Sequence, residues 1–384
     1  MLRGDWIPDF TPESKVAFVI PVYNEANVIG DLLNNINEII PKSPFHVDIF
    51  VFEDGSTDET KKILETLYQS GNIPRLKINM TPERKGYPKA AKEAIMSIDP
   101  SKYPYILFMD GDGQYVMEDI FRLLDYCKQN PNYDMIIGCR KHRVEPLWRK
   151  FITASLRFLE SILFGPTIKD VTSALRLMNT ELTREITSQV SYTQYNFWFE
   201  FTARMTKYNL KVMEVPVNYV QREDGDSQVY SLKKIPKILL KETNALLMTF
   251  YDLNRYNIIK FGLVGLSGAI IILFLTWFLT QFIGLWYILS AIISIELSII
   301  WAFTLNTKIT FNYTFKNSQH IYTSLLKYHG TALGGMLINL VILYLLTEYI
   351  HIYYLLSESI AIVVAFGFNY FASTRYVWKK SLDL

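Results

Sequence analysis

Residues 105–112, Tyr-Ile-Leu-Phe-Met-Asp-Gly-Asp, place two acidic side chains directly after an apolar run. The run predicts a buried strand, and Asp110 and Asp112 follow at its exposed end, one residue apart. Positions i and i+2 of an extended backbone share a face. Two carboxylates on one face repel each other unless a cation lies between them. The segment therefore predicts a site for a hard divalent cation at the end of a strand.

The chain around this segment alternates strand-length apolar runs with helical stretches. We expect strands at residues 16–20, 47–52, 76–80, 105–109 and 135–138, and helices at 26–40, 58–70, 89–98 and 117–130. This alternation favours an α/β fold in which helices cover a mainly parallel, Rossmann-like sheet. Ligands of such sheets bind beyond the carboxyl ends of the strands.

Polar side chains concentrate at that edge of the predicted sheet. Residues 21–25, 53–56 and 110–114 each follow a strand, and three such clusters on one edge predict a cleft. Asp110, Asp112 and Gln114 all offer oxygen donors, which suit Mg²⁺ or Mn²⁺. The alternative for the acidic pair is a capped turn between a strand and a helix.

The other two clusters offer groups that fit a nucleotide. Asp54 could accept the ring N–H that uracil and guanine both present, so the base stays open. Tyr23 could lie against the base or the ribose, and Glu25 could bind a polar group of either. The alternative for Asp54 and Ser56 is ordinary loop and cap chemistry.

The second half of the chain is far more apolar. Residues 261–295 contain no Asp, Glu, Lys, Arg or His. As one helix they would be about 52 Å long, against about 30 Å of hydrocarbon, so we expect a turn near Gly284. A second apolar pair follows. The predicted spans are about 258–283, 286–305, 327–349 and 353–371.

Charge predicts which side of the membrane each segment faces. Lysines lie between the two pairs of spans, and Arg375, Lys379 and Lys380 follow the last span, whereas the tight turns carry no Lys or Arg. By the positive-inside rule both termini and the first domain are cytoplasmic. Residues 1–12 lack the apolar core of a signal peptide. The net charge is only +2, so nucleic acid is not an expected partner, and Cys127 and Cys139 suggest no disulfide framework.

The membrane half repeats itself after a shift of 67 residues. The shift matches residues 286–290 with 353–357 and residues 307–311 with 374–378, including their aromatic and basic side chains. We interpret this as two copies of one helical hairpin, each with an even number of spans. Glu296 lies in a span and is a functional candidate, with an interhelical hydrogen bond or a place near the bilayer edge as alternatives.

Residues 230–254 connect the two halves and predict a basic amphipathic helix. Lysines at 233, 234, 237 and 241 occupy one side, and apolar residues lie nearby. Such a helix would lie on an anionic bilayer surface, or would dock on the first domain as a soluble helix. The expected domains are therefore 1–229, the interfacial region 230–254 and the transmembrane domain 255–384.

Several motifs together resemble a known enzyme family. Residues 21–25, 53–60 and 110–114 resemble family 2 glycosyltransferases of the GT-A fold, over about residues 15–230. Residues 138–140, 148–150, 170–176 and 222–227 narrow the resemblance to dolichol-phosphate mannose synthases and related polyprenyl-phosphate glycosyltransferases. The repeat half is similar to the four-helix GtrA-like membrane family.

The resemblance implies a metal-dependent, inverting transfer of a sugar, with mannose from GDP-mannose as the first candidate, to dolichyl or polyprenyl phosphate at the cytoplasmic membrane face. The implied metal is Mg²⁺ or Mn²⁺, held by Asp110, Asp112 and Gln114. The implied catalytic residues are Asp112, Arg140, Arg149 and Arg222, the arginines clamping phosphate groups. The implied donor-binding residues are Pro21, Tyr23, Glu25, Phe52, Asp54, Ser56, Asp110, Gln114 and Ser227.

The chain departs from the family pattern at three places. Gly111 replaces the usual alanine between the two aspartates, Ala174-Leu175 replaces Gly-Phe, and Gln228 replaces a lysine that is one candidate phosphate contact. The Gln-x-x-Arg-Trp motif of polysaccharide synthases is absent, which argues against a polymerising enzyme. For Arg140 and Arg149 a surface salt bridge is the alternative, and Arg176 could be structural, within a strand.

Three other functions compete with the leading one. The donor could be UDP-glucose. The membrane half could instead move a lipid-linked sugar across the bilayer, with the first domain only binding the nucleotide sugar. The first domain could also be a nucleotide-binding scaffold without catalysis, in which case Asp112 would be dispensable for turnover.

Overall fold

The computed structural model describes residues 14–43, 45–130, 133–141, 147–165, 168–208, 210–220 and 235–378. The chain divides into two compact units, one of Met1–Leu253 with Leu382–Leu384 and one of Asn254–Ser381.

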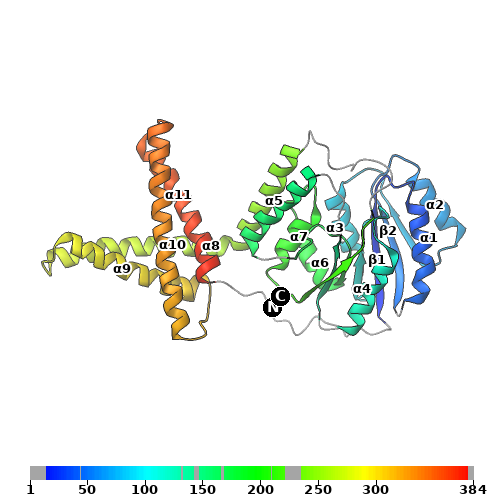
Figure 1. Ribbon diagram of the computed structural model, residues 1–384, viewed down its shortest axis with the longest axis horizontal. Coiled ribbons are helices and arrows are strands. Elements are labelled where there is room, and N and C mark those ends of the chain that lie inside the picture. The colour runs from blue at the N-terminus through cyan, green and yellow to red at the C-terminus, as the bar shows by residue number, and fades with distance from the viewer. Residues whose placement is uncertain are drawn as a thin grey trace. The chain divides into compact units, whose positions relative to one another are not determined.

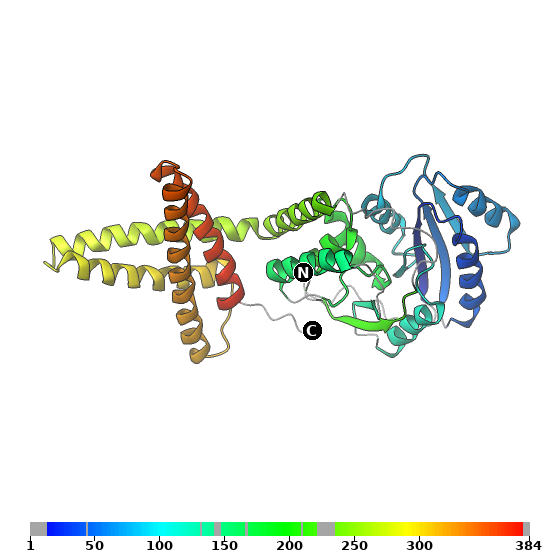
Figure 2. The same ribbon diagram turned by 45° about the horizontal axis from the view of Figure 1, so that its top comes forward.

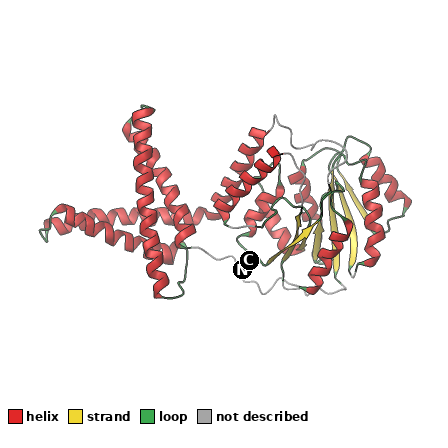
Figure 3. Ribbon diagram, viewed as in Figure 1, coloured by secondary structure: helices red, strands yellow, loops and turns green. Residues whose placement is uncertain are grey.

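The first unit is built on a mixed sheet, shown in yellow in Figure 3. Its described strands are β1 (Lys15–Val22), β2 (His46–Glu53), β3 (Leu76–Met80), β4 (Tyr105–Phe108), β5 (Met135–Arg140), β6 (Arg176–Asn179) and β7 (Val212–Val217). Their order is β3-β2-β1-β4-β6-β5-β7. Only β6 runs antiparallel to its neighbours β4 and β5. The prediction of an α/β domain with a mainly parallel sheet is confirmed.

Helices cover both faces of this sheet (Figure 1). The described helices are α1 (Ile29–Ile39), the short η1 (Ile40–Lys42), α2 (Thr60–Ser70), α3 (Tyr87–Ser97), α4 (Met117–Gln129), α5 (Leu147–Phe164), α6 (Thr180–Gln189) and α7 (Phe197–Met205). Side chains of β1 alternate between two apolar cores, since Phe18 and Ile20 join α1, α2 and α4, and Val19 joins α3, α5, α6 and α7. Both faces are therefore buried, as parallel strands require.

Arg176 is a structural residue of β6. Its side chain is fully buried, and it donates to the carbonyls of Ser173 (2.9 Å) and Val171 (2.7 Å). The guanidinium also lies 4.1 Å from the ring centre of Trp198. Hydrogen bonds and ring contact together compensate the burial of the charge, so the structural alternative for Arg176 is the correct one.

Helix α8 (Ile235–Gln281) is a single helix of 47 residues, unbroken in Figure 2. The sequence predicts an interfacial helix region over 230–254 and a first span from about residue 258; the structure joins the two in one continuous helix, which passes from the first unit into the second at residues 253–254. Its first part belongs to the first unit, where Ile238 and Leu246 are buried and Leu246 packs in the second core. Lys237 and Leu240 on the same part are exposed. Docking on the domain is therefore observed, and contact with a bilayer stays a prediction.

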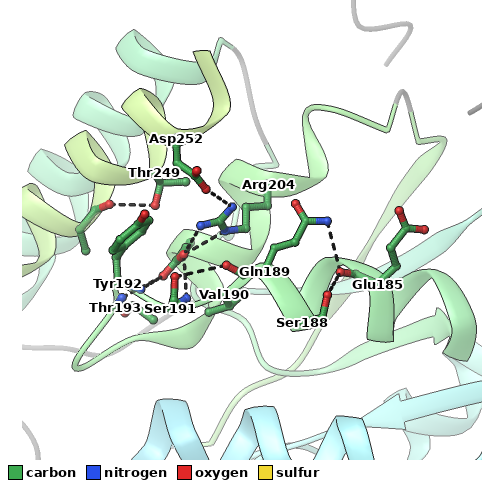
Figure 4. A network of polar contacts seen from close by, with 12 residues as sticks. Glu185, Ser188, Gln189, Val190, Ser191, Tyr192, Thr193, Arg204, Thr249 and Asp252 are labelled. Carbon is green, nitrogen blue, oxygen red and sulfur yellow. Dashed lines mark hydrogen bonds and ion pairs between the residues drawn. The ribbon is translucent and has the colours of Figure 1, made fainter. Parts of the chain in front are cut away.

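Polar contacts fasten this first part of α8 to α7 and the loop before it (Figure 4). The guanidinium of Arg204 bonds Glu200 and Asp252, each at 2.9 Å. Glu200 also accepts the backbone N–H groups of residues 191–193, and Glu242 accepts those of residues 194 and 195. Two buried carboxylates thus shape the loop from Ser191 to Asn196, which leads into α7.

In the part of the chain that the structure describes, four helices are long and apolar enough to cross a membrane, and the remainder of α8 is the first. The others are α9 (Tyr287–Leu305), α10 (Ser318–Tyr344) and α11 (Tyr354–Ala372), with the π-helical turns η3 (Asn306–Thr310), η4 (Leu345–Tyr349) and η5 (Ser373–Val377). Four such helices agree with the predicted number of spans.

The predicted repeat is visible in the geometry of the second unit. The bounds of α11 follow those of α9 by 67 residues (354 − 287 and 372 − 305), and η5 follows η3 by the same interval (373 − 306 and 377 − 310). The turns also match, because Gly284 has φ 76° and His351, 67 residues later, has φ 59°. Repeat mates Phe311 and Trp378 stack on each other, with ring centres 4.4 Å apart.

Glu296 of α9 lies in this second unit. Its carboxylate contacts His329 Nε2 of α10 at 3.0 Å, so one of the alternatives for this residue, an interhelical hydrogen bond, is observed. The repeat mates of this pair are Val363 and Gly262, so this contact joins the two copies of the hairpin and has no counterpart at the matching positions.

Candidate active site

Asp110 and Asp112 lie just beyond the end of β4, at the edge where the sequence predicts ligands. Asp110 Oδ1 accepts the hydroxyl of Tyr87 at 2.8 Å. Burial, the largest cause, and the neighbouring carboxylate of Asp112 together raise the pKa of Asp110 to about 7. Arg140 lies close enough to act in the opposite direction and lower it. A cation beside these two carboxylates would relieve both effects.

Glycines at positions 111 and 113 make possible the turn that carries the two aspartates, residues 110–113, which we call the acidic turn. A Cβ on Gly111 would lie 2.8 Å from Val22 Cγ2 and 3.0 Å from the carbonyl oxygen of Pro21. Gly113 has φ +69°, and a Cβ there would lie 2.3 Å from Val28 Cγ1. The turn therefore packs tightly against the end of β1 and the start of α1, and the glycine at 111 has a steric reason in this chain.

Gln114 has a structural role in addition to its predicted one. Its side-chain amide donates to the Val220 carbonyl (2.8 Å), and its oxygen accepts the Tyr219 hydroxyl (2.8 Å). Its backbone N–H donates to Asp112 Oδ1 at 3.2 Å. The side chain thus joins the acidic turn to the segment after β7, and its role as a third metal ligand stays a prediction. Among the described residues, no group of three or more His, Cys, Asp or Glu side chains is arranged to hold a metal ion.

Asp54 is buried at the end of β2 and holds a neighbouring loop. Its two carboxylate oxygens accept the backbone N–H groups of Lys85 (2.8 Å) and Gly86 (2.9 Å). The guanidinium of Arg84, in the same loop, lies 3.8 Å from the ring centre of Tyr23. The two residues we predicted at the nucleobase therefore both contact the loop between β3 and α3, and their contact with a base stays a prediction.

The remaining predicted donor residues also cluster at this edge. The Ser56 hydroxyl accepts the backbone N–H of Asn24 (2.9 Å), so loop chemistry is observed for Ser56. The backbone N–H of Glu25 donates to Thr60, and the Glu25 carboxylate is near enough to raise the pKa of Asp110. The Pro21 carbonyl accepts the N–H of Gly111. Phe52 instead packs, half-buried, against the second core.

Arg140 is part of a buried ion pair at the end of β5. Its Nε and Nη2 donate to the two oxygens of Asp170 at 2.7 and 2.8 Å, and Nη2 also donates to Thr172 at 2.6 Å. Side-chain exposure is 8% for Arg140 and 6% for Asp170, so the ion pair is buried and is not the surface salt bridge that was the alternative for Arg140. These bonds hold the Arg140 guanidinium in one orientation beside the acidic turn.

The other two predicted arginines cannot be placed in this site. Arg149 is in the first turn of α5, where the backbone alone is described. Arg222 and Ser227 lie outside the described residues. Their roles stay predictions.

Sequence reasoning missed Tyr87, Arg84 and Asp170 as residues of this edge. Tyr87 and Arg84 lie in or next to the loop after β3, which meets the same edge as the three predicted clusters. The loop follows the carboxyl end of a predicted strand, so the rule that ligands bind beyond these ends could have found it. The loop lacks the cluster of acidic and amide side chains that identified the other three segments, so its sequence alone does not indicate a binding site. Asp170 was part of a family motif without a role of its own.

Comparison with known proteins gives a match in each half of the chain. Residues 17–187 match the family described as glycosyl transferase family 2, and residues 260–378 match the family described as GtrA/DPMS, transmembrane domain. A dolichol-phosphate mannosyltransferase from Pyrococcus furiosus is 28% identical, over 95% of this chain and 99% of that protein. An undecaprenyl-phosphate mannosyltransferase from Micrococcus luteus is 25% identical, over 56% of this chain and 87% of that protein.

Solved structures are more distant. Mannosyl-3-phosphoglycerate synthase from Rubrobacter xylanophilus aligns with a TM-score of 0.47 and 12% identity, over 64% of this chain and 80% of that chain.

Proposed function

We propose that this chain, a glycosyltransferase that joins a family 2 glycosyltransferase domain to a GtrA/DPMS transmembrane domain, transfers mannose from GDP-mannose to dolichyl or polyprenyl phosphate. The observation that carries the proposal is the similarity to a dolichol-phosphate mannosyltransferase along nearly the full length of both proteins. The relative from Micrococcus luteus, named for undecaprenyl phosphate, supports the same class of acceptor.

The residues present fit a divalent metal. Asp110 and Asp112 offer hard oxygen donors one residue apart, in surroundings that disfavour two uncompensated negative charges. We assign both carboxylates, with Gln114, to Mg²⁺ or Mn²⁺. A bound metal would neutralise charge on the donor diphosphate as it leaves. Asp54, Tyr23, Glu25 and the end of β1 would bind the nucleoside part of the donor.

The acceptor needs orientation more than activation. A phosphate monoester has a second pKa of about 6, so its oxygen is already anionic near neutral pH and requires no strong general base. What the site must supply is positive charge where two phosphate groups approach each other. Arg140 is fixed by Asp170 at the site edge, and we assign Arg149 and Arg222 to the same clamp.

The geometry of attack sets the stereochemistry. A single displacement by the acceptor oxygen inverts the anomeric carbon, so an α-linked donor gives a β-linked lipid phosphate. The chain is an integral membrane protein. We place the catalytic unit and both termini in the cytoplasm, because lysines and arginines flank the spans on one side only.

The test is a transfer assay with the full chain in detergent or vesicles. Purified protein is incubated with Mn²⁺ or Mg²⁺, polyprenyl phosphate and either radiolabelled GDP-mannose or UDP-glucose, and the lipid product is extracted. We expect mannosyl lipid with β-configuration, abolished by Asp112→Ala and by chelation of the metal. Glucosyl lipid alone would replace the donor assignment. Normal turnover by Asp112→Ala would overturn the metal-assisted mechanism.

A further inference from the structure

Two hydrogen bonds connect the buried start of α7 to the acidic turn. The indole Nε1–H of Trp198 donates to the Tyr87 hydroxyl oxygen at 2.9 Å, and the Tyr87 hydroxyl donates to Asp110 Oδ1 at 2.8 Å. An indole nitrogen only donates, whereas a phenol oxygen both donates and accepts. Because the oxygen of Tyr87 accepts from Trp198, its own proton is directed at Asp110.

Trp198 is fixed by its packing, so its indole N–H can orient the Tyr87 hydroxyl toward Asp110. Its side chain is 1% exposed, and its ring packs edge-on against Phe108 with centres 5.0 Å apart. The guanidinium of Arg176 lies against the same ring. Asn196, the residue before α7, accepts the backbone N–H of Trp198 at 3.0 Å. Neighbours on β4, β6 and α7 therefore fix the donor before any ligand arrives.

We propose that Tyr87 is a positioning residue for Asp110, with Trp198 orienting its hydroxyl, an inference that rests on the metal role proposed above for Asp110. The hydroxyl holds Oδ1 in place, so that the carboxylate would present its other oxygen to a bound cation. It also keeps the carboxylate in one rotamer against the repulsion of Asp112. Partners of this kind orient metal ligands, and their loss weakens metal binding or activity by about 10- to 100-fold.

The chain offers a matched control. Tyr103 is also buried, and its hydroxyl donates to Asp48, but this pair lies at the opposite end of the sheet, before β4 and near the start of β2. Tyr103→Phe therefore removes the same chemical bond between a tyrosine and an aspartate without approaching the acidic turn. A general loss of a buried hydrogen bond would affect both variants in the same way.

The experiment measures Mn²⁺ binding by electron paramagnetic resonance, with and without GDP or UDP, alongside turnover and melting temperature of the full chain. We expect Tyr87→Phe to weaken Mn²⁺ affinity by about 10- to 100-fold, Trp198→Phe to weaken it less, and Tyr103→Phe to leave it unchanged. Equal Mn²⁺ affinity in Tyr87→Phe and the wild type would overturn the inference, as would equal weakening by Tyr103→Phe.

The failure of this inference can be told apart from the failure of the proposed function. If the wild type itself takes up no Mn²⁺ in the presence of either nucleotide, the metal role of Asp110 is wrong and Tyr87 has nothing to position. If the wild type binds Mn²⁺ and the Asp112→Ala variant does not, the metal site stands, and the Tyr87→Phe result then decides the positioning role.

Discussion

Adding one methyl group between the two aspartates tests how tightly the acidic turn is packed. The Gly111→Ala substitution introduces the alanine that is usual at this position in the family that the sequence resembles. In this chain its Cβ would lie 2.8 Å from Val22 Cγ2, 3.0 Å from the Pro21 oxygen and 3.1 Å from Ile20 Cγ2. Overpacking of this kind costs about 1–3 kcal/mol. For a unit of this size that corresponds to a fall of about 2–12 °C in melting temperature.

Activity should fall together with stability. Relief of the contact moves Asp110 or Asp112, and misplacement by about 1 Å costs up to about 100-fold in rate. The assays are melting temperature by intrinsic fluorescence in detergent and sugar transfer at saturating metal. Gly30→Ala is the matched control, because a Cβ there meets only Ile63 at 3.7 Å. That change in α1 should be neutral or stabilising by about 0.5–1 kcal/mol.

A double substitution separates crowding from other effects. Val22→Ala removes the atom closest to the new methyl group, so the double variant should be more stable than the sum of the two single changes by about 0.5–3 kcal/mol. If Gly111→Ala keeps wild-type stability and turnover, the close approach is relaxed without cost and the steric argument is wrong. Additive effects in the double variant would locate the strain elsewhere than Val22.

Three further predictions concern other parts of the chain. Burial raises the pKa of Glu160 well above its usual range, so its stabilising contribution is full below about pH 4 and is lost as pH rises through the folded pKa. The melting temperature of Glu160→Gln minus that of the wild type should therefore be larger at about pH 8 than at about pH 5. A difference that does not change with pH would contradict this. Asp170→Asn should cut transfer by about tenfold or more by releasing one partner of a buried ion pair, measured against the same variant's melting temperature. Gly335→Ala places a Cβ 2.1–2.5 Å from the Asn369 side chain and should lower the melting temperature, whereas Gly330→Ala, with no atom within 4 Å, should not.

The edge of the sheet was predictable because it depends on local patterns. A buried apolar run followed by polar residues identifies both a strand and the end at which its ligands collect. Asp54, Asp110 and Asp112 were found in this way. The partner of Arg140 and the hydroxyl beside Asp110 were not found, because Asp170 and Tyr87 lie 30 and 23 residues away and only the tertiary fold brings them close.

The continuity of α8 was missed for a different reason. A change from charged to apolar composition near residue 255 predicts a boundary between domains, but a change of composition does not by itself end a helix. Glycine, proline and capping residues do, and residues 237–261 contain neither glycine nor proline. The antiparallel β6 was also missed, since four buried residues without alternation carry no sign of their direction.

The stacked rings of Phe311 and Trp378 bear on the origin of the membrane unit. Where a two-fold axis relates two copies of a unit, a position that touches its own counterpart lies close to that axis. In a homodimer of single hairpins, the ancestral residue there would have met itself, as self-complementary interfaces require. Tandem fusion of such a gene turns one symmetric contact into two independently mutable sites. Each half can then change independently, and the two halves differ at the Glu296–His329 contact, where the matching positions hold Val363 and Gly262.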